Sequence, residues 1–373
     1  YARQGLKGSA RYVSMGGAFH ALGGDLSAVS DNPAAAAVFL NSELAVTLNA
    51  MDNKINTNYM GENNQVDSRS TDFDQLGLVL VLNDTNGNDF VKISFAYNYQ
   101  NEQVFNNKYN AIGTNPNRGL DDYFLTFAGG IPYEDIKTYD DESISNSYRY
   151  LGENRGFSAQ QAFLGFQSYM INPLVEEDSN ILYETNSNPQ GHPVDHDFFV
   201  TQTGMNSKHS FTLATQYKQK LYLGLNLNSY RSEFTRVDNL VENNYGVGSN
   251  FDFAEFQNEL LTIGQGFSFQ LGAILRASKN IRMGLSYQSP IWFNMTDELQ
   301  QYIITKKNSG TDTIEPNIVN LYDYKMSTNS MYSVGLAYIF GNKGLISFQY
   351  DHANYQKNSF DIGNGDVNFI NQN

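Results

Sequence analysis

The sequence predicts an all-β protein: a transmembrane antiparallel β-barrel of about 14 strands with an N-terminal segment packed in its lumen. Two observations carry this prediction. Apolar and polar residues alternate in runs of roughly 9–11 residues, the length that a tilted strand needs to cross a bilayer. The composition also combines 25 Tyr and 25 Phe with a single Trp, and aromatic residues are typical of both rims of such barrels.

The hydropathy of the chain decides between strands and helices as membrane-crossing elements. No continuous apolar run of about 18 residues occurs, so a membrane-spanning helix is excluded. The mean hydropathy of -0.45 is low, which a barrel tolerates because each strand alternates lipid-facing apolar and lumen-facing polar residues. A soluble β-sandwich also alternates, but long strands with aromatic ends and short turns favour the barrel.

The clearest alternation lies in residues 90–100. One face carries Val91, Ile93, Phe95, Tyr97 and Tyr99, and the other carries Lys92, Ser94, Ala96, Asn98 and Gln100. Residues 76–82 alternate in the same way, and the polar segment 84–89 between the two runs has the composition of a turn. The two runs therefore predict a β-hairpin.

Further strands follow from the same pattern. Two more hairpins are predicted, residues 267–275 with 281–287 and residues 332–340 with 346–350. The remaining candidate strands are 43–51, 197–205, 209–217, 220–235, 252–263, 291–305 and 317–327. The total is roughly a dozen strands, and bacterial barrels of this kind have even numbers, so about 14 is expected.

The alternation lapses between about residues 103 and 196. A structureless loop of that length is uncommon in a compact domain, so this extracellular loop region should have a fold or function of its own. Within it, residues 158–171 have a helical pattern, with Ser158 as N-cap and Pro173 just beyond the end. We therefore divide the chain into an N-terminal hatch, residues 1–41, and a barrel, residues 42–373, that carries the long loop.

The first 41 residues differ from the rest in being rich in small residues and in lacking alternation. They include Met15-Gly16-Gly17-Ala18 and the triplet Asn32-Pro33-Ala34. Gly and Pro at this density interrupt regular strands and favour turns. The segment is therefore expected to be a compact plug and not a strand.

The stretch from Ser9 to Phe39 resembles the N-terminal hatch of the FadL family of outer-membrane transporters, in a variant associated with Bacteroidota. Residues 283–290 and 338–341 resemble strands of the same family. Ala35-Ala36 departs from the family, in which Gly-Leu or Gly-Ile commonly follows the triplet. The family continues through further strands, so the closing strands are expected to lie outside this sequence, which begins at Tyr1 as a processed or partial chain.

The resemblance implies passive uptake of hydrophobic small molecules, such as long-chain fatty acids, across the outer membrane of a Gram-negative bacterium. Outer-membrane lipids and the ligand would then be the partners. The ligand would bind a lumenal pocket closed by the hatch and leave sideways through the wall at a kinked strand, expected here near residues 89–102. The hatch and gate residues would be Gly16, Gly17, Asn32, Pro33 and Ala34.

Capture of such a ligand requires apolar side chains exposed to water. The long loop region offers Phe124, Phe127, Phe163, Phe166 and Met170 as the hydrophobic capture patch. The alternative is that these residues form the small core of the loop region, because the apolar face of a helix usually packs inward.

Other chemistry has little support in the sequence. The net charge of -15 argues against nucleic acid, and the absence of cysteine excludes thiolate chemistry. Two histidines in residues 191–197 are separated by a proline, so a metal site is not expected there, and acidic pairs such as Asp121-Asp122 and Asp140-Asp141 lack the spacing of a calcium loop. With no nucleophile motif or phosphate-binding loop, we expect neither an enzyme nor a cofactor.

A second function remains open. A barrel of this family can lack transport and serve as an accessory subunit of a larger outer-membrane complex, with other outer-membrane proteins as partners. The long acidic loop region would then be a docking surface. A cavity continuous with the loop region would favour transport, whereas a hatch packed without any void would favour the accessory role.

Overall fold

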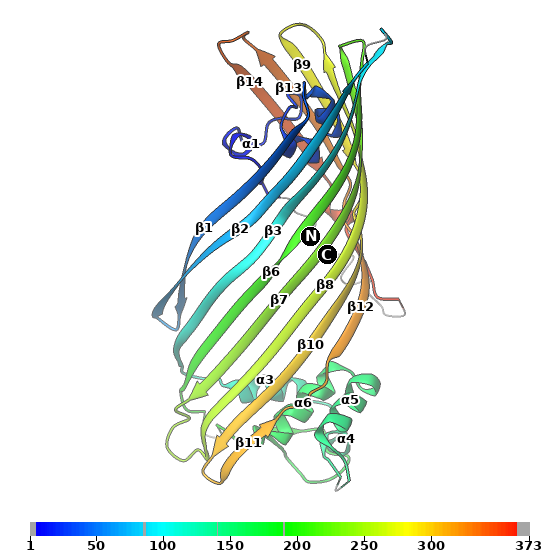
Figure 1. The fold of residues 1–373 in the computed structure, drawn as a ribbon. Helices are drawn as coiled ribbons and strands as arrows, with labels where there is room; N and C mark the ends of the chain where they lie inside the picture. Colours follow the sequence, from blue (N-terminus) through cyan, green and yellow to red (C-terminus); the bar gives the residue numbers. More distant parts are fainter. Residues whose placement is uncertain (1–4, 85–86, 140, 189–190, 364–373) are drawn as a thin grey trace.

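The protein is built around one large, curved antiparallel sheet of long strands. The computed structural model describes residues 5–84, 87–139, 141–188 and 191–363. Within that part, 13 strands form one sheet in the order β1-β2-β3-β6-β7-β8-β10-β12-β15, and β9, β11, β13 and β14 pair beside this path (Figure 1). Strands that are consecutive in the chain are mostly neighbours in the sheet, so the connections are hairpins.

The longest strands are in the first half of the sheet. Their bounds are β1 Glu43–Tyr59, β2 Glu62–Asn83, β3 Phe90–Asn115, β6 Val194–Tyr217, β7 Leu221–Asn243 and β8 Phe251–Arg276. The later strands are β9 Ile281–Gln288, β10 Trp292–Lys307, β11 Gly310–Ile314, β12 Asn320–Ser327, β13 Met331–Ile339, β14 Leu345–Ala353 and β15 Ser359–Asp361.

The three predicted hairpins are confirmed. Leu78 pairs with Tyr97 in β2 and β3, Leu271 pairs with Tyr287 in β8 and β9, and Leu336 pairs with Phe348 in β13 and β14. Residues 85–86 of the first predicted turn lie outside the described residues. Residues 364–373, the last of the sequence, lie outside them as well.

Several strands are longer than expected. The predicted strands 197–205 and 209–217 are one strand, β6, and β1 and β2 meet at a tight turn near residues 60–61. β3 continues to Asn115, so the region without long strands is 116–193, shorter than the expected 103–196. Polar residues occupy both faces of these extensions, so they carry no period-two signal.

The sheet is interrupted along one line. The short gaps 289–291, 328–330 and 354–358 separate β9 from β10, β12 from β13 and β14 from β15. They lie side by side, because Gln288 pairs with Met331 before the first gap and Trp292 pairs with Ser327 after it. Pro290 has no backbone N–H to donate, which interrupts a ladder of hydrogen bonds.

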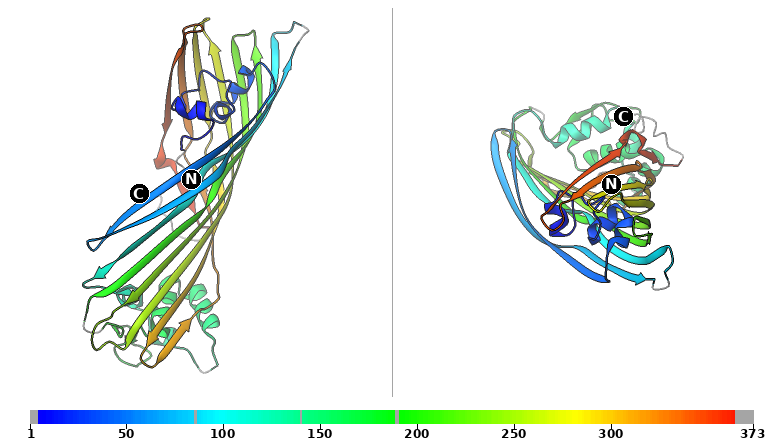
Figure 2. Two further views of the ribbon diagram at one scale, coloured as in Figure 1. Left: turned by 60° about the vertical axis from the view of Figure 1, so that its left-hand side comes forward. Right: turned by 90° about the horizontal axis from the view of Figure 1, so that it is seen from above.

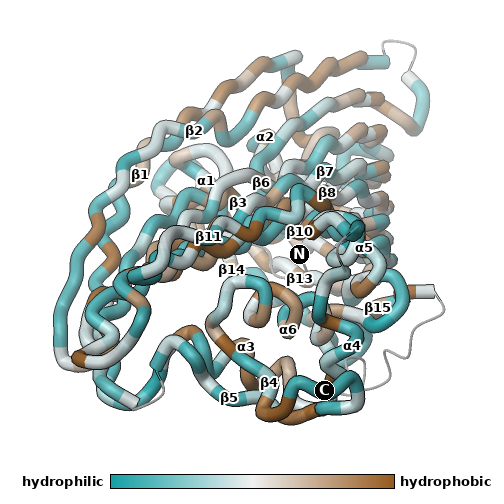
Figure 3. Tube along the Cα trace, turned by 90° about the horizontal axis from the view of Figure 1, so that it is seen from below, coloured by the Kyte–Doolittle hydropathy of each residue, from teal (hydrophilic) through white to brown (hydrophobic). Residues whose placement is uncertain are grey.

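In the half of the sheet that holds the N-terminal segment, large apolar side chains mostly point outward and small or polar ones point inward. In β13, Leu336 is 48% exposed, whereas the inward-facing Ser333 is 2% exposed. The predicted polar face of β3 is likewise inward and buried, from Lys92 to Gln100. Polar and apolar positions alternate along the strands in Figure 3, which looks at the sheet from the end where helices α3–α6 lie.

The N-terminal segment lies against the concave face of the sheet near one end (Figure 2). Its helices are α1 Ala10–Ser14, α2 Leu26–Asp31 and the 3-10 helix η1 Pro33–Val38. Each begins at a side-chain cap: Ser9, Asp25 and Asn32 accept hydrogen bonds from the backbone N–H groups of Tyr12, Ser27 and Ala34. The expected compact plug is therefore a small helical unit.

Pairs of glycines in the sheet let this segment approach closely. Gly224 pairs with Gly272, and Gly284 pairs with Gly335. A Cβ atom at Gly272 would overlap Asn32 Oδ1, and one at Gly335 would lie 2.8 Å from the Cβ of His20. The lack of side chains at these positions thus allows backbone-level contact between segment and sheet.

The region 116–193 folds into a second helical unit at the opposite end of the sheet. We call it the cap; its elements are α3 Leu120–Ala128, α4 Tyr133–Ile136, α5 Ile144–Asn154, α6 Phe157–Gln167, β4 Ile171–Pro173 and β5 Tyr183–Thr185. The predicted helix 158–171 corresponds to α6, but Ser158 is not its N-cap. Gly156 is, with a φ of 85° that favours glycine.

Membrane-crossing helices are absent from the described residues, as no helix there is both long enough and apolar enough to span a bilayer.

Candidate functional site

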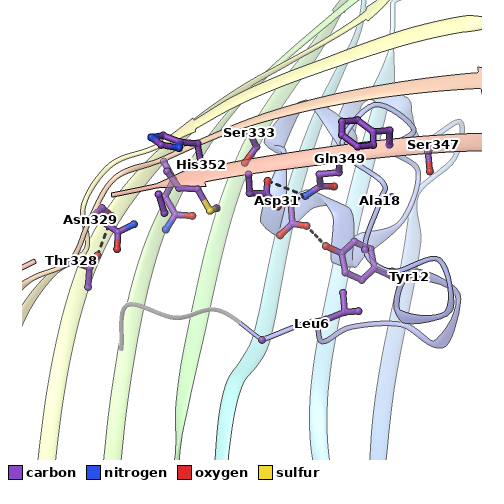
Figure 4. Close-up of a pocket in the computed structure, with 18 of the residues that line it drawn as sticks. Leu6, Tyr12, Ala18, Asp31, Thr328, Asn329, Ser333, Ser347, Gln349 and His352 are labelled. Carbon is purple, nitrogen blue, oxygen red and sulfur yellow. Dashed lines mark hydrogen bonds between the residues drawn. The ribbon is translucent and has the colours of Figure 1, made fainter. Parts of the chain in front are cut away.

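A cavity of about 700 Å³ lies between the N-terminal segment and the last strands of the sheet. Its walls are residues of the N-terminal segment on one side and inward-facing residues of β13, β14 and the gaps 289–291 and 328–330 on the other (Figure 4). Its volume falls within the roughly 300–1,000 Å³ that small-molecule sites occupy. None of the described lining residues belongs to the cap, so this cavity does not reach the long loop region.

The polar part of the wall contains both hydroxyl groups and hydrogen-bond acceptors. Asp31 and Asp351 contribute carboxylates, and Asp31 accepts a hydrogen bond from the Tyr12 hydroxyl (Figure 4). Asn329 is 7% exposed and its Oδ1 has no hydrogen-bond partner, and the Oε1 of Gln349 has none either. Buried acceptors without a partner are costly, so they are expected to meet a donor from outside the chain.

Burial changes the protonation of the N-terminal segment. It raises the pKa of Asp31 to about 6, against the opposing hydrogen bond from Tyr12 and the nearby Lys208. Burial, and then the Asp31 charge, raises the pKa of Tyr12, so the phenol remains a donor at neutral pH. Burial also lowers the pKa of His20 to about 4, which keeps the imidazole neutral.

The predicted gate residues fall into two groups. Gly16 and Gly17 line the cavity, with φ angles of 63° and 75° that favour glycine. Asn32, Pro33 and Ala34 are not among its described lining residues; they pack against β7 and β8, where Asn32 Nδ2 donates to the carbonyl oxygens of His20 at 2.9 Å and Ala273 at 3.3 Å. The triplet thus fixes the segment to the sheet.

Polar side chains on the inner face of the sheet also hold the segment. They donate to backbone carbonyl oxygens of the segment: Asn226 Nδ2 to Val29 in α2 at 2.8 Å, and Arg282 to Leu22 in the turn before α2 at 2.7 Å. Lys208 is 2% exposed and donates to the carbonyl of Ser30 at 3.0 Å. The polar face of the strands is therefore matched to the segment's backbone.

An apolar cluster on the inner face adjoins the cavity. Its buried members are Tyr230, Ile291, Phe293, Met295 and Met326. Ile291 also lines the cavity, so the two are continuous. In β8, Gly264 and Gly266 leave room for the side chains of Met295 and Phe293.

The predicted capture residues lie inside the cap. Phe124, Phe163 and Met170 are fully buried, and Phe127 and Phe166 are partly buried. They pack with sheet residues such as Phe256 and Ile303, which favours the alternative that they form the core of the loop region. The exposed aliphatic side chains of the cap are Leu174, Val175, Ile181 and Leu182, and Phe157 at the start of α6 is exposed as well.

In the region near 89–102, where a wall opening is expected, β3 stops pairing with β2 after Gln100. β3 shifts register at Phe90/Lys92 and at Asn101/Gln103, but it stays paired with β6 on both sides of each shift. The strands are interrupted elsewhere, at the gaps 289–291, 328–330 and 354–358, which lie far from β1 in the order of the sheet. Pro290 is the one residue in the sequence that indicates this interruption of the sheet.

No group of three or more His, Asp or Glu in the described residues is arranged to hold a metal ion. His196 lies between the Tyr59 hydroxyl, 2.8 Å from its Nδ1, and Glu242, 2.9 Å from its Nε2. Asp121 is buried and accepts a hydrogen bond from Thr185, and burial raises its pKa. Asp140 of the second acidic pair lies outside the described residues.

Sequence reasoning missed the acceptors of the cavity. Gln349 and Asp351 share the polar face of β14 with Ser347, so alternation alone could have placed them inward. Asn329 lies in a gap between strands and Asp31 at the end of α2, where no periodic signal applies.

Comparison with known proteins gives no relative from which a role could be transferred. No protein-family model matches this sequence, and no curated protein matches it.

Proposed function

We propose that the chain is an outer-membrane β-barrel that takes up hydrophobic small molecules passively, with the N-terminal segment as its hatch. The observation that carries this proposal is the continuity between the inner apolar cluster and the cavity beside the N-terminal segment, which meet at Ile291. An apolar surface next to a cavity, on a face that is otherwise polar, suits a ligand with a hydrocarbon part.

The outward-facing side chains support a membrane location. Leu, Phe, Ile and Val are exposed on neighbouring strands in the half of the sheet that holds the N-terminal segment, for example Leu80, Phe95, Leu213 and Leu285. An exposed apolar surface spread over many strands is rare in soluble monomers. Its extent along the strands, such as 267–275 in β8, fits the 9–11 residues of a membrane strand.

The route would pass beside the hatch and out through the wall. The hatch is held by many hydrogen bonds and by close contact at glycines, so it would remain in place while the ligand uses the adjacent cavity. The aligned gaps at 289–291 and 328–330 line that cavity and lack part of the strand ladder. They are the proposed lateral exit, in place of the region near 89–102.

A second candidate is the accessory subunit, and one observation favours it. Leu174, Val175, Ile181 and Leu182 expose apolar side chains together on the cap, because Leu174 N–H donates to the Leu182 carbonyl across the hairpin. Such a patch is typical of a protein interface. Fixed partners that co-purify with the native chain, and are lost in a Leu174→Ser/Leu182→Ser variant, would support this role.

The deciding experiment for uptake uses full-length protein in liposomes and a fluorescent long-chain hydrophobic probe. We expect saturable uptake that changes when residues 1–41 are deleted. Phe293→Ala should reduce uptake by roughly tenfold to a hundredfold, because losing a buried aromatic contact costs about 1.5–3 kcal/mol. Trp292→Ala is the matched control, since Trp292 is exposed on the opposite face. Transport would be refuted if the probe entered liposomes at the same, unsaturable rate with each protein variant and with no protein.

A further inference from the structure

The walls of the cavity beside the N-terminal segment differ in chemistry, and this difference bears on the ligand's head group. Leu6, Ile291 and Met331 supply apolar contacts, and Ile291 leads to the inner apolar cluster. The polar wall includes hydroxyl groups and the carboxylates of Asp31 and Asp351, together with two buried acceptors, Asn329 Oδ1 and Gln349 Oε1, that have no partner in the described residues. One end of the site therefore accepts hydrocarbon, and the other end accepts hydrogen bonds.

The charge of the polar wall is negative. No Lys or Arg occurs among the described residues that line the cavity, whereas two Asp do. Lys208, the nearest cation to Asp31, lies beneath the segment at 2% exposure, 4.0 Å from Glu102 and bound to the Ser30 carbonyl. A ligand carboxylate would meet two negative charges there, and none of the described lining residues is a Lys or Arg that could compensate them.

Asn329 is a separate observation that points to a ligand. The side chain is more than nine-tenths buried, its Nδ2 donates to the Ser330 carbonyl at 3.2 Å, and its Oδ1 faces no donor. It lies in the gap at 328–330, next to Thr328 at the cavity wall (Figure 4). An amine or hydroxyl of a ligand would supply the missing donor.

We propose that this cavity selects amphiphiles whose head group donates hydrogen bonds and carries no negative charge, an amine or an alcohol, over fatty carboxylates. The proposal rests on the proposed function and specifies its substrate class. The hydrocarbon tail would lie on the Ile291 side, and the head group would bind Asn329 Oδ1 and the carboxylates of Asp31 and Asp351.

The first test compares three probes of equal chain length: octylamine, octanol and octanoate. Their affinities for full-length protein in zwitterionic lipid nanodiscs are measured by titration calorimetry at pH 7.5, with empty nanodiscs subtracted. We expect octylamine to bind at least tenfold more tightly than octanoate, with octanol between them. Octanoate binding as tightly as octylamine would overturn the proposal.

Variants of the cavity carboxylates test whether the cavity causes the preference for an amine over a carboxylate. In the double variant Asp31→Asn/Asp351→Asn, the affinities for octylamine and octanoate should differ by no more than about twofold. In the single variant Asp351→Asn, a change at an exposed position, the ratio of the two affinities should fall at least threefold. Asp252→Asn, with the same charge change on β8 near the cap, should leave it unaltered. An unaltered ratio in both cavity variants would refute the assignment.

A second variant tests the acceptor without changing charge. Asn329→Leu keeps the size of the side chain and removes Oδ1, so binding of octanol should fall at least threefold. Unchanged octanol binding would show that Asn329 does not face the head group.

The two proposals fail separately. Uptake of the hydrophobic probe without any head-group preference would leave transport standing and remove the selectivity. An amine preference without uptake would establish the site and remove transport.

Discussion

The N-terminal segment and the cap are small helical units at opposite ends of one sheet, and both have an apolar core that continues into the sheet, but only the segment docks at backbone level on pairs of glycines. The segment has short helices, and the sheet contacts its backbone through glycines and polar donors such as Asn226 and Arg282. The cap has an apolar core that includes Phe163 and continues into the sheet at Phe256 and Ile303. The segment also buries Phe19, Leu26 and Val29, so its docking depends on volume and in addition on close backbone approach and on the charge of Asp31, whereas the cap depends mainly on the volume of its core.

The largest expected effect is in the cap. Phe163→Ala should destabilise it by about 3–5 kcal/mol, because the side chain is fully buried and would leave a cavity. Hydrogen exchange of α3 to α6 should rise, while exchange in β7 and β8 near the N-terminal segment stays unchanged. Faster exchange at both ends would mean that the two units are not independent.

The second effect is pH dependence in the N-terminal segment. Asp31 has a folded pKa of about 6, above the unfolded value of 3.8. The folded state therefore binds more protons between these values, and stability is greatest below about pH 4 and falls as the pH rises through 6, by at most about 3 kcal/mol. The groups that act on Asp31 are Tyr12, Lys208, Asp351 and Glu102.

Asp31→Asn should abolish this dependence. The measurement is hydrogen exchange of α1 and α2 at pH 4.5 and 7.5, corrected for intrinsic rates, with the cap as internal reference. The same pH profile in the native and Asn proteins would contradict burial of the Asp31 charge.

The third effect concerns the glycine contacts. Gly272→Val should displace Asn32 and destabilise the docked segment by about 1–3 kcal/mol, the usual cost of overpacking. Proteolysis within residues 5–41 should accelerate. Ala273→Val, on the opposite face of the same strand, is the control, and equal proteolysis of both variants would argue against close packing at Gly272.

The smallest effect is expected for Asn32→Ala. It removes the cap of η1 and the bonds to the His20 and Ala273 carbonyls, at a cost of about 1–2 kcal/mol. A matched change, Ser143→Ala, removes the N-cap of α5 in the cap, at the opposite end of the sheet. If only the first variant increases proteolysis of the N-terminal segment, Asn32 anchors it.

Much of the sheet could be predicted because its period-two pattern is strong where one face is apolar. The hairpins at 76–100 and 267–287 are such places. Residues 52–75 and 103–115 escaped prediction, since their strands are polar on both faces and pair through the backbone. Local pattern does not report that kind of pairing.

The candidate site was harder to predict. The sequence indicated a compact N-terminal segment and its Asn32-Pro33-Ala34 triplet, but the cavity forms where that segment meets strands some 300 residues later. Contacts between such distant residues depend on sheet register, which single-sequence patterns do not specify. The aromatic residues of the cap were assigned to capture because composition does not distinguish an exposed apolar face from a buried one.

The length of the strands determines how far the cap lies from the part of the sheet that is proposed to face the membrane. β3 and β8 each have 26 residues, on the order of 85 Å at about 3.3 Å per residue and roughly 65 Å in height at a tilt of about 40°. An apolar band is only about 25 Å tall. In the proposed orientation the cap would therefore stand tens of ångströms above the bilayer, where molecules too large to approach the lipid surface could still touch it.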